Sequence, residues 1–99
     1  MHLNEEQFRS YLKDTRGVSD VTVRRYITGL QTINSILQKY YFDIPNVYDV
    51  RSFEDLETIK NFLDVSEEYR TKDRIGHSMY SASFKHFYRF AYSIIASQK

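Results

Sequence analysis

The chain has 99 residues, a formal net charge of +1 and no cysteine, which sets the size of one domain with a modest core. The lack of cysteine excludes disulfides, thiol catalysis and cysteine-based zinc sites, and it agrees with the cytoplasmic location that we predict. The first residues, MHLNEEQF, contain no apolar run, so no signal peptide is expected, and no stretch approaches the roughly 20 apolar residues of a membrane span.

The first helix is expected to begin after Asn4, because Gln7 stands three residues further on and can complete a capping box. Gly17 ends this segment, since glycine readily takes the left-handed conformation that follows a helix. The core face of the helix consists of Phe8, Tyr11 and Leu12.

A long second helix follows, with apolar residues in steps of three and four. Either Ser19 or Asp20 is expected to cap it. Gly29 lies inside the helix, where glycine costs about 1 kcal/mol relative to alanine, so it predicts either a slight bend or close packing against a neighbour. The core positions are Val23, Tyr26, Ile27, Leu30, Ile33, Leu37 and Tyr40.

The helical pattern breaks around Pro45, so residues 42–52 are expected to form a loop with one helical turn. Ser52 then caps a third helix whose first turn is acidic, as the helix dipole favours. A short fourth helix begins within residues 66–68 and ends near Gly76. The third helix has the core positions Phe53, Leu56, Ile59, Phe62 and Leu63 and the outward acids Glu54, Asp55 and Glu57.

The last helix is predicted to start at His77 or Ser78. No β alternation, internal repeat or low-complexity segment occurs in the sequence. The predicted fold is therefore all-α, a single domain over residues 1–99 built as a compact bundle of four to five helices. The core face of the last helix comprises Tyr80, Phe84, Phe87, Ala91 and either Ile94 or Ile95.

Charge is distributed unevenly along the chain. Residues 1–42 carry a net charge of +2, residues 43–68 carry −6 and residues 69–99 carry +5, which returns the total of +1. A domain of this kind can present a basic patch that attracts phosphates. In the alternative, the acidic and basic segments face each other and neutralise internally, and the sequence leaves both arrangements open.

Catalysis has little support in the sequence. Histidines stand only at positions 2, 77 and 86, too scattered for a ligand set, and no HExxH, P-loop or glycine-rich dinucleotide motif is present. The carboxylates form no identifiable acid–base pair. We therefore expect a protein that is not an enzyme and that uses no cofactor or metal.

The last helix carries a hydrophilic stripe opposite its core face. Hydroxyls and backbone amides near a helix start, with cations further along, suit the oxygens of a phosphate. The alternative is an ordinary solvated helix face. The stripe consists of Ser78, Ser81, Lys85 and Arg89, spaced i, i+3, i+7 and i+11, and the segment before it adds Arg70, Lys72, Arg74 and His77.

A second basic patch is predicted at the start of the second helix, where free amides and the helix dipole favour an anion. Its members are Ser19, Thr22, Arg24 and Arg25. In the alternative interpretation Ser19 or Asp20 only caps the helix, and Asp20 would partly repel a phosphate. The two patches would lie close together if the second and last helices pack side by side.

Two segments resemble a known family. The run FRSYLKDTRGVSDVTVRRYITGLQTINSIL is similar to the N-terminal core-binding domain of tyrosine recombinases, and HSMYSASFKHFYRFA resembles the closing helix of that domain. The pattern of a short capped helix, a long helix and a final helix of this kind also resembles small helical modules at the N-termini of HNH-type and modified-DNA restriction endonucleases, and the final segment is closer to this second group. The resemblance implies a SAM-like, core-binding type of fold and double-stranded DNA as the partner, with catalysis in a separate domain.

The resemblance also implies roles for individual residues. At the start of the second helix, Ser19, Thr22 and Arg25 would contact phosphates. The chain departs from the family because it carries no catalytic Arg-His-Arg-Tyr set and because its acidic segment, residues 43–68, would have to face away from DNA. The residues of the last helix that would follow the duplex are Ser81, Lys85 and Arg89.

These observations predict a non-catalytic module that binds duplex DNA and no membrane, within a restriction nuclease or recombinase-like system or as a small stand-alone protein. The alternative is a protein-interaction module, such as an inhibitor, an adaptor or a homodimerising domain. That module would use the exposed aromatic residues of the last helix, Tyr88, Phe90 and Tyr92.

Overall fold

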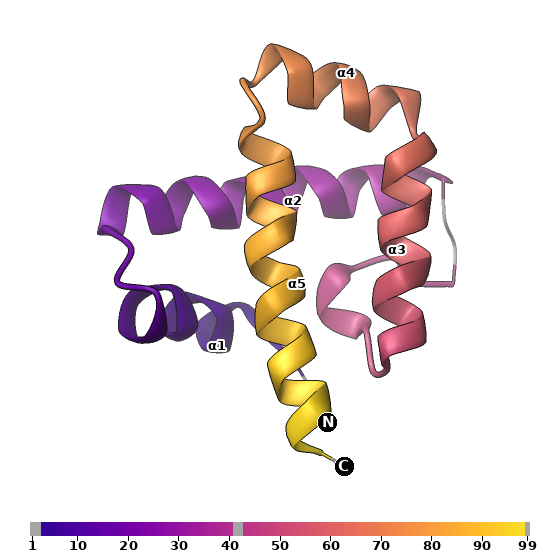
Figure 1. The fold of residues 1–99 in the computed structure, drawn as a ribbon. Helices are drawn as coiled ribbons and strands as arrows, with labels where there is room; N and C mark the ends of the chain where they lie inside the picture. Colours follow the sequence, from indigo (N-terminus) through magenta and orange to yellow (C-terminus); the bar gives the residue numbers. More distant parts are fainter. Residues whose placement is uncertain (1–2, 41–42, 99) are drawn as a thin grey trace.

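Five α-helices make up the part of the chain that the computed structural model describes, residues 3–40 and 43–98 (Figure 1). No strand occurs in these residues, so the predicted all-α fold is confirmed. The chain also contains two shorter helical turns. A π-helical turn, Tyr11–Thr15, extends the first helix, and a 3-10 turn, Val47–Asp49, lies in the loop where the sequence predicts one helical turn. The helices are α1 (Glu5–Ser10), α2 (Asp20–Tyr40), α3 (Phe53–Val65), α4 (Glu67–Ile75) and α5 (Met79–Ser97).

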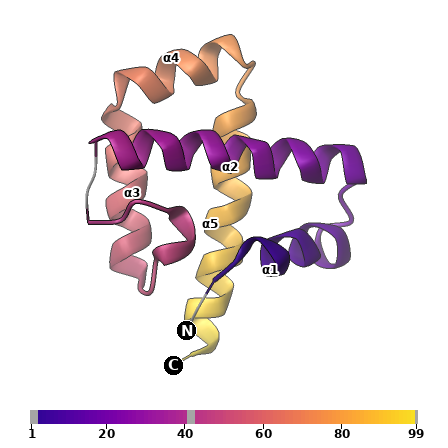
Figure 2. The same cartoon turned by 180° about the vertical axis from the view of Figure 1, so that it is seen from behind.

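The helices form a flat slab. α5 crosses α2 near the middle of α2 and packs directly against it, while α1 and α3 lie on opposite sides of α5 (Figures 1 and 2). The Cα atoms extend over 32 × 31 × 16 Å. One broad side of the slab is therefore formed by the outward face of α5, which Figure 1 shows in front, and the other by α2, which Figure 2 shows in front.

The helix boundaries follow capping residues that the sequence predicts. In α1 the Gln7 backbone N–H donates to Asn4 Oδ1 at 2.9 Å, and the Asn4 N–H donates to Gln7 Oε1 at 3.2 Å. Gly17 ends the segment that follows α1 with a φ of +65°. Ser52 and Ser66 cap α3 and α4, because each hydroxyl accepts a backbone N–H three residues further on. These bonds satisfy amides that have no partner within their helix.

The start of α5 lies later than the sequence predicts. His77 and Ser78 take the left-handed conformation, with φ values of 54° and 67°, and the helix begins at Met79. Residues other than glycine are strained in this region. The two residues reverse the chain between α4 and α5, which places them on the surface next to α2 rather than within the helix.

The core lies between α2 and α5 and is closed by α1 and α3. The predicted apolar stripes are buried or half-buried with one exception, Tyr40, which is 47% exposed. Conversely, Ile36 and Phe90 are buried although neither belongs to the predicted core faces. The large side chains that are almost completely buried include Phe8, Leu12, Leu30, Ile33, Leu37, Leu56, Ile59, Leu63 and Phe87.

Gly29 lies where α2 and α5 approach each other closely. A Cβ atom at this position would collide with Ser83 Oγ and would lie 2.9 Å from Ser83 Cβ. Ser83 is itself buried, and its hydroxyl donates to the Met79 carbonyl oxygen at 3.0 Å. Close packing of α5 against α2 therefore explains this glycine.

A buried hydrogen bond ties the loop after α2 back onto that helix. The Val47 N–H donates to Asn34 Oδ1 at 2.8 Å, and both residues are buried. Replacing Asn34 with alanine leaves a buried N–H without a partner, so we expect the free energy of unfolding to fall by about 2 kcal/mol. Urea denaturation measures this loss. Asn61→Ala, on the exposed face of α3, serves as the control and is expected to change little, and an equal loss in both variants would contradict the assigned role of Asn34.

Candidate nucleic-acid interface

The outward side of α5 carries two cations. Lys85 and Arg89 lie one helical turn apart and are exposed, while Phe87 and Ala91 on the other side of the helix are buried in the core. Neither cation forms an ion pair with any residue that the structure describes. Both are therefore free to meet an anion, as the sequence predicts for this stripe.

Ser81, one of the two serines of the predicted stripe, already forms hydrogen bonds within the protein. The Ser81 N–H donates to Asp73 Oδ1 at 2.8 Å, and the Ser81 hydroxyl donates to the Ser78 carbonyl oxygen at 3.0 Å. Asp73 thus takes the place at the start of α5 that a phosphate would need. The interpretation of Ser81 as a phosphate donor is therefore not supported, and Lys85 and Arg89 are what remains of the stripe as charge carriers.

The start of α2 meets the turn before α5. Thr22 and Arg25 line one surface hollow together with His77 and Ser78. The two patches predicted from the sequence are therefore brought together, through the α4–α5 turn. The side chains of Arg24 and Arg25 are exposed, and neither forms an ion pair within the described residues.

Ser19 acts as the cap of α2. Its hydroxyl accepts the Thr22 N–H at 3.4 Å and donates to Thr22 Oγ1 at 3.0 Å, so the two hydroxyls satisfy each other. Asp20 lies 3.1 Å from Lys13 Nζ, which offsets its charge. The capping interpretation of Ser19 is confirmed, and Arg24 and Arg25 are the residues of this patch whose side chains are available to a ligand.

The three cations before α5 do not act as one group. Arg70, Lys72 and Arg74 all belong to α4 and not to a loop. Arg70 and Arg74 share a face one turn apart, whereas Lys72 lies on the other side of the helix. The charge of Lys72 instead acts on Glu68, whose pKa it helps to lower. Arg70 and Arg74 are therefore placed on one face of α4 and Lys72 on another.

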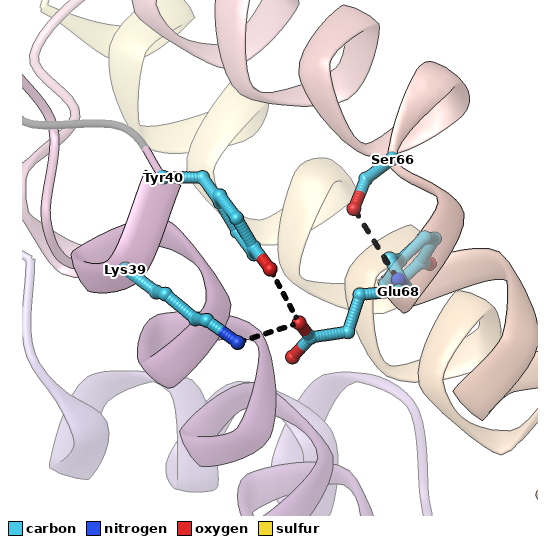
Figure 3. Close-up of polar contacts among 5 residues, drawn as sticks. Lys39, Tyr40, Ser66 and Glu68 are labelled. Carbon is cyan, nitrogen blue, oxygen red and sulfur yellow. Dashed lines mark hydrogen bonds and ion pairs between the residues drawn. The ribbon is translucent and has the colours of Figure 1, made fainter.

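Glu68 joins the end of α2 to the start of α4. Its Oε1 accepts the Tyr40 hydroxyl at 2.9 Å and lies 3.2 Å from Lys39 Nζ, as Figure 3 shows. Ser66 lies beside this contact and caps α4. The hydrogen bonds from Tyr40 and Lys39 lower the pKa of Glu68. Here an acid of the middle segment neutralises a cation of residues 1–42, and not one of the basic segment 69–99.

The acidic side of α3 borders α5. Glu57 Oε1 accepts the Tyr88 hydroxyl at 2.6 Å, and this bond, followed by burial, raises the pKa of Tyr88 to about 12. Asp64 lines a groove with Lys85 and Arg89, where it lies 3.3 Å from Lys60 Nζ. The acidic segment therefore does not face wholly away from the cations of α5.

Only part of the aromatic surface that the protein-interaction alternative requires is exposed. Phe90 is only 3% exposed, because its ring packs against Phe8 and Tyr11 of the first helical segment at 5.4 and 5.5 Å between centroids. Tyr88 is tied to Glu57. Tyr92 is 49% exposed and packs against Phe53 at 4.5 Å. The interpretation of Phe90 as an exposed contact residue is therefore wrong.

His86 and Arg16 belong to the same surface, although the sequence predicts neither as a site residue. The His86 ring stacks on Tyr26 of α2 at 4.7 Å between centroids. Burial, then the charges of Arg16, Arg89 and Lys85, lower the pKa of His86. The position of His86 between Lys85 and Arg89 is a signal that the sequence contains, but no spacing links it to Arg16 in the connection between α1 and α2.

A basic face can now be defined by Arg16, Arg25, Lys85 and Arg89, with His86 among them. It extends from the outward side of α5 to the start of α2, and Glu57 and Asp64 of α3 border it, since Asp64 lines a groove with Lys85 and Arg89. All four cations are exposed, and none of them forms an ion pair among residues 3–40 and 43–98.

Other kinds of site find no support in the described residues. They contain no group of three histidine, cysteine or acidic side chains placed to hold a metal ion, and none of their helices combines the length and apolar character needed to cross a bilayer. No family model matches the chain, and comparison with curated proteins and with solved structures finds no match. The resemblance to core-binding domains and endonuclease modules therefore stays a prediction from the sequence.

Proposed function

We propose that this domain is a non-catalytic DNA-binding module that holds the backbone of duplex DNA against its basic face. The observation that carries the proposal is that Lys85 and Arg89 stand one turn apart on the outward side of α5, exposed and without an ion pair in the described residues. The charge of Arg16, in the α1–α2 connection, acts on His86 between them, and Arg25 at the start of α2 is exposed and unpaired as well. A phosphate backbone supplies the missing negative charge.

The shape of the molecule fits this role. Its broad side measures 32 × 31 Å, and one turn of B-DNA is about 34 Å long. A helix on the outside of a flat slab can therefore lie along the duplex without a cleft to admit it. Contacts of this kind position a protein on DNA but carry little sequence information, so we expect modest affinity and weak sequence preference.

The wider setting follows from the sequence resemblance. A backbone-holding module without catalytic residues would serve a restriction nuclease or a recombinase-like system, in which another domain or chain cuts or rejoins the DNA. The core-binding, SAM-like type of fold belongs to the same proposal. Its support is the resemblance of the first two helical segments and of the last helix, together with the all-α bundle.

Salt dependence tests the proposal. Fluorescence anisotropy with a labelled duplex, from about 50 to about 200 mM salt, should give a plot of log K against log salt concentration with a slope of about −4 to −5, because about four to six phosphates are neutralised at roughly 0.9 each. The proposal would be contradicted if the duplex did not bind at low salt, or if its affinity did not change with the salt concentration. The alternative of a homodimerising domain predicts instead a mass that rises with concentration in light scattering.

A further inference from the structure

His86 occupies an unusual position at the edge of the basic face. Its ring is half-buried against Tyr26, and Nδ1 is buried without a hydrogen-bond partner in the described residues. A protonated imidazole would place an N–H at Nδ1, and a buried N–H without an acceptor is costly. The neutral form with its proton on Nε2 is therefore favoured, and Nε2 is the nitrogen that is left to reach a ligand.

The charged neighbours of His86 on α5 are cations. Lys85 precedes it, Arg89 lies one turn further on, and the α2 residue that packs on its ring is the neutral Tyr26. Asp64 of α3 lines the groove on the far side of Lys85 and Arg89, whereas the charges that act on His86 itself are those of Arg16, Arg89 and Lys85. None of these cations forms an ion pair among the described residues. A group with several negatively charged oxygens would offset these charges and accept a hydrogen bond from His86.

We propose that Arg16, Lys85, Arg89 and His86 form a binding subsite for a single phosphate group, in which His86 Nε2–H donates to a phosphate oxygen and the three cations supply charge. The inference deepens the proposed function, because a backbone phosphate of DNA is the expected occupant. The same chemistry would also bind a free phosphate compound such as pyrophosphate, so the experiment separates the two sources.

Occupation of the subsite has a consequence for the proton on His86. The negative charge of the phosphate offsets the three cations that now oppose protonation, so the pKa of His86 rises on binding. Binding then takes up a proton. By linkage, phosphate binding becomes tighter as the pH falls through the range between the pKa of the bound form and the lower pKa of the free form.

Nuclear magnetic resonance of the histidine side chains tests the subsite directly. Titration from about pH 5 to about pH 8 should show His86 as the Nε2–H tautomer and should show its pKa rising when pyrophosphate is added, and rising also with a short duplex. His86→Gln assigns the signals, and His77→Gln leaves them in place. A pKa of His86 that moves with neither ligand, or an Nδ1–H tautomer, would overturn the inference.

The affinity for duplex DNA provides a second test of the subsite. The wild type should bind several-fold more tightly at about pH 6 than at about pH 7.5, and His86→Gln should lose this difference. Arg16→Gln should weaken binding about fivefold at physiological salt, as loss of one phosphate contact does.

The two proposals fail in different ways. A rise in the pKa of His86 with pyrophosphate but no duplex binding would support the subsite and contradict the DNA-binding function. Duplex binding that has the same pH dependence in the wild type and in His86→Gln would support DNA binding and contradict the subsite.

Discussion

Replacing Lys85 and Arg89 together with glutamine is expected to weaken duplex binding roughly 10- to 100-fold at physiological salt and to lower the magnitude of the salt slope by about 2. Both cations are exposed on the outward side of α5 and unpaired within the described residues, so each can neutralise a phosphate. The fold should be unaffected, because neither side chain packs in the core. Anisotropy over a salt series, with circular dichroism as the check on folding, measures both quantities.

Lys39→Gln with Lys72→Gln is the matched control, since it removes the same number of charges. Lys39 is paired with Glu68, and Lys72 lies on the same side of α4 as that acid. We expect the control to bind almost as well as the wild type. Equal losses in the two double variants would mean that net charge alone attracts the duplex, and it would contradict a defined basic face.

Sequence signals that act over a few residues predicted the helices well. Asn4 with Gln7, Gly17, Ser52 and Ser66 each act within three or four residues, so their hydrogen bonds and backbone angles depend on the sequence nearby. The apolar stripes behave in the same way, because the helical period alone decides which residues share a face. These signals were sufficient for the fold class and for the order of the helices.

The errors concern residues whose role depends on another part of the chain. Phe90 is buried only because the first helical segment brings Phe8 and Tyr11 against α5, about 80 residues away along the chain. The N–H of Ser81 is engaged by Asp73, which lies on the other side of the turn before α5. No periodicity within one helix carries this information.

The same limit applies to the candidate site. The cations of α5 were predicted from spacing, and the start of α2 was predicted from helix-terminal chemistry, but their meeting depends on the crossing of α2 and α5. Arg16 belongs to the basic face although no motif marks it as functional. Lys72 lies outside the basic face, because helix geometry places it on the same side of α4 as Glu68. The net charge of residues 69–99 does not show which of their cations belong to the basic face and which lie beside an acid.

The crossing that brings the two patches together depends on Gly29, and its replacement by valine is expected to lower the free energy of unfolding by about 3 kcal/mol. A Cβ at this position collides with Ser83 Oγ, lies 2.9 Å from Ser83 Cβ and lies 3.2 Å from Met79 Sδ. Ser83 is buried on the core helix α5 and cannot move aside without shifting that helix. The gain in helix propensity over glycine is well below 1 kcal/mol for valine, so it does not offset the clash. Urea denaturation measures the loss.

A double-mutant cycle identifies the cause. Ser83→Gly removes the two nearest atoms, so the combined variant Gly29→Val with Ser83→Gly should lose less than the sum of the single variants, by about 1 kcal/mol or more. Thr28→Val places the same side chain at the exposed neighbouring position of α2 and should be nearly neutral. Strict additivity would show that the α2–α5 contact is not what requires glycine. Because Arg25 and His86 are held in place by this crossing, Gly29→Val should also weaken duplex binding under conditions where the variant is still folded.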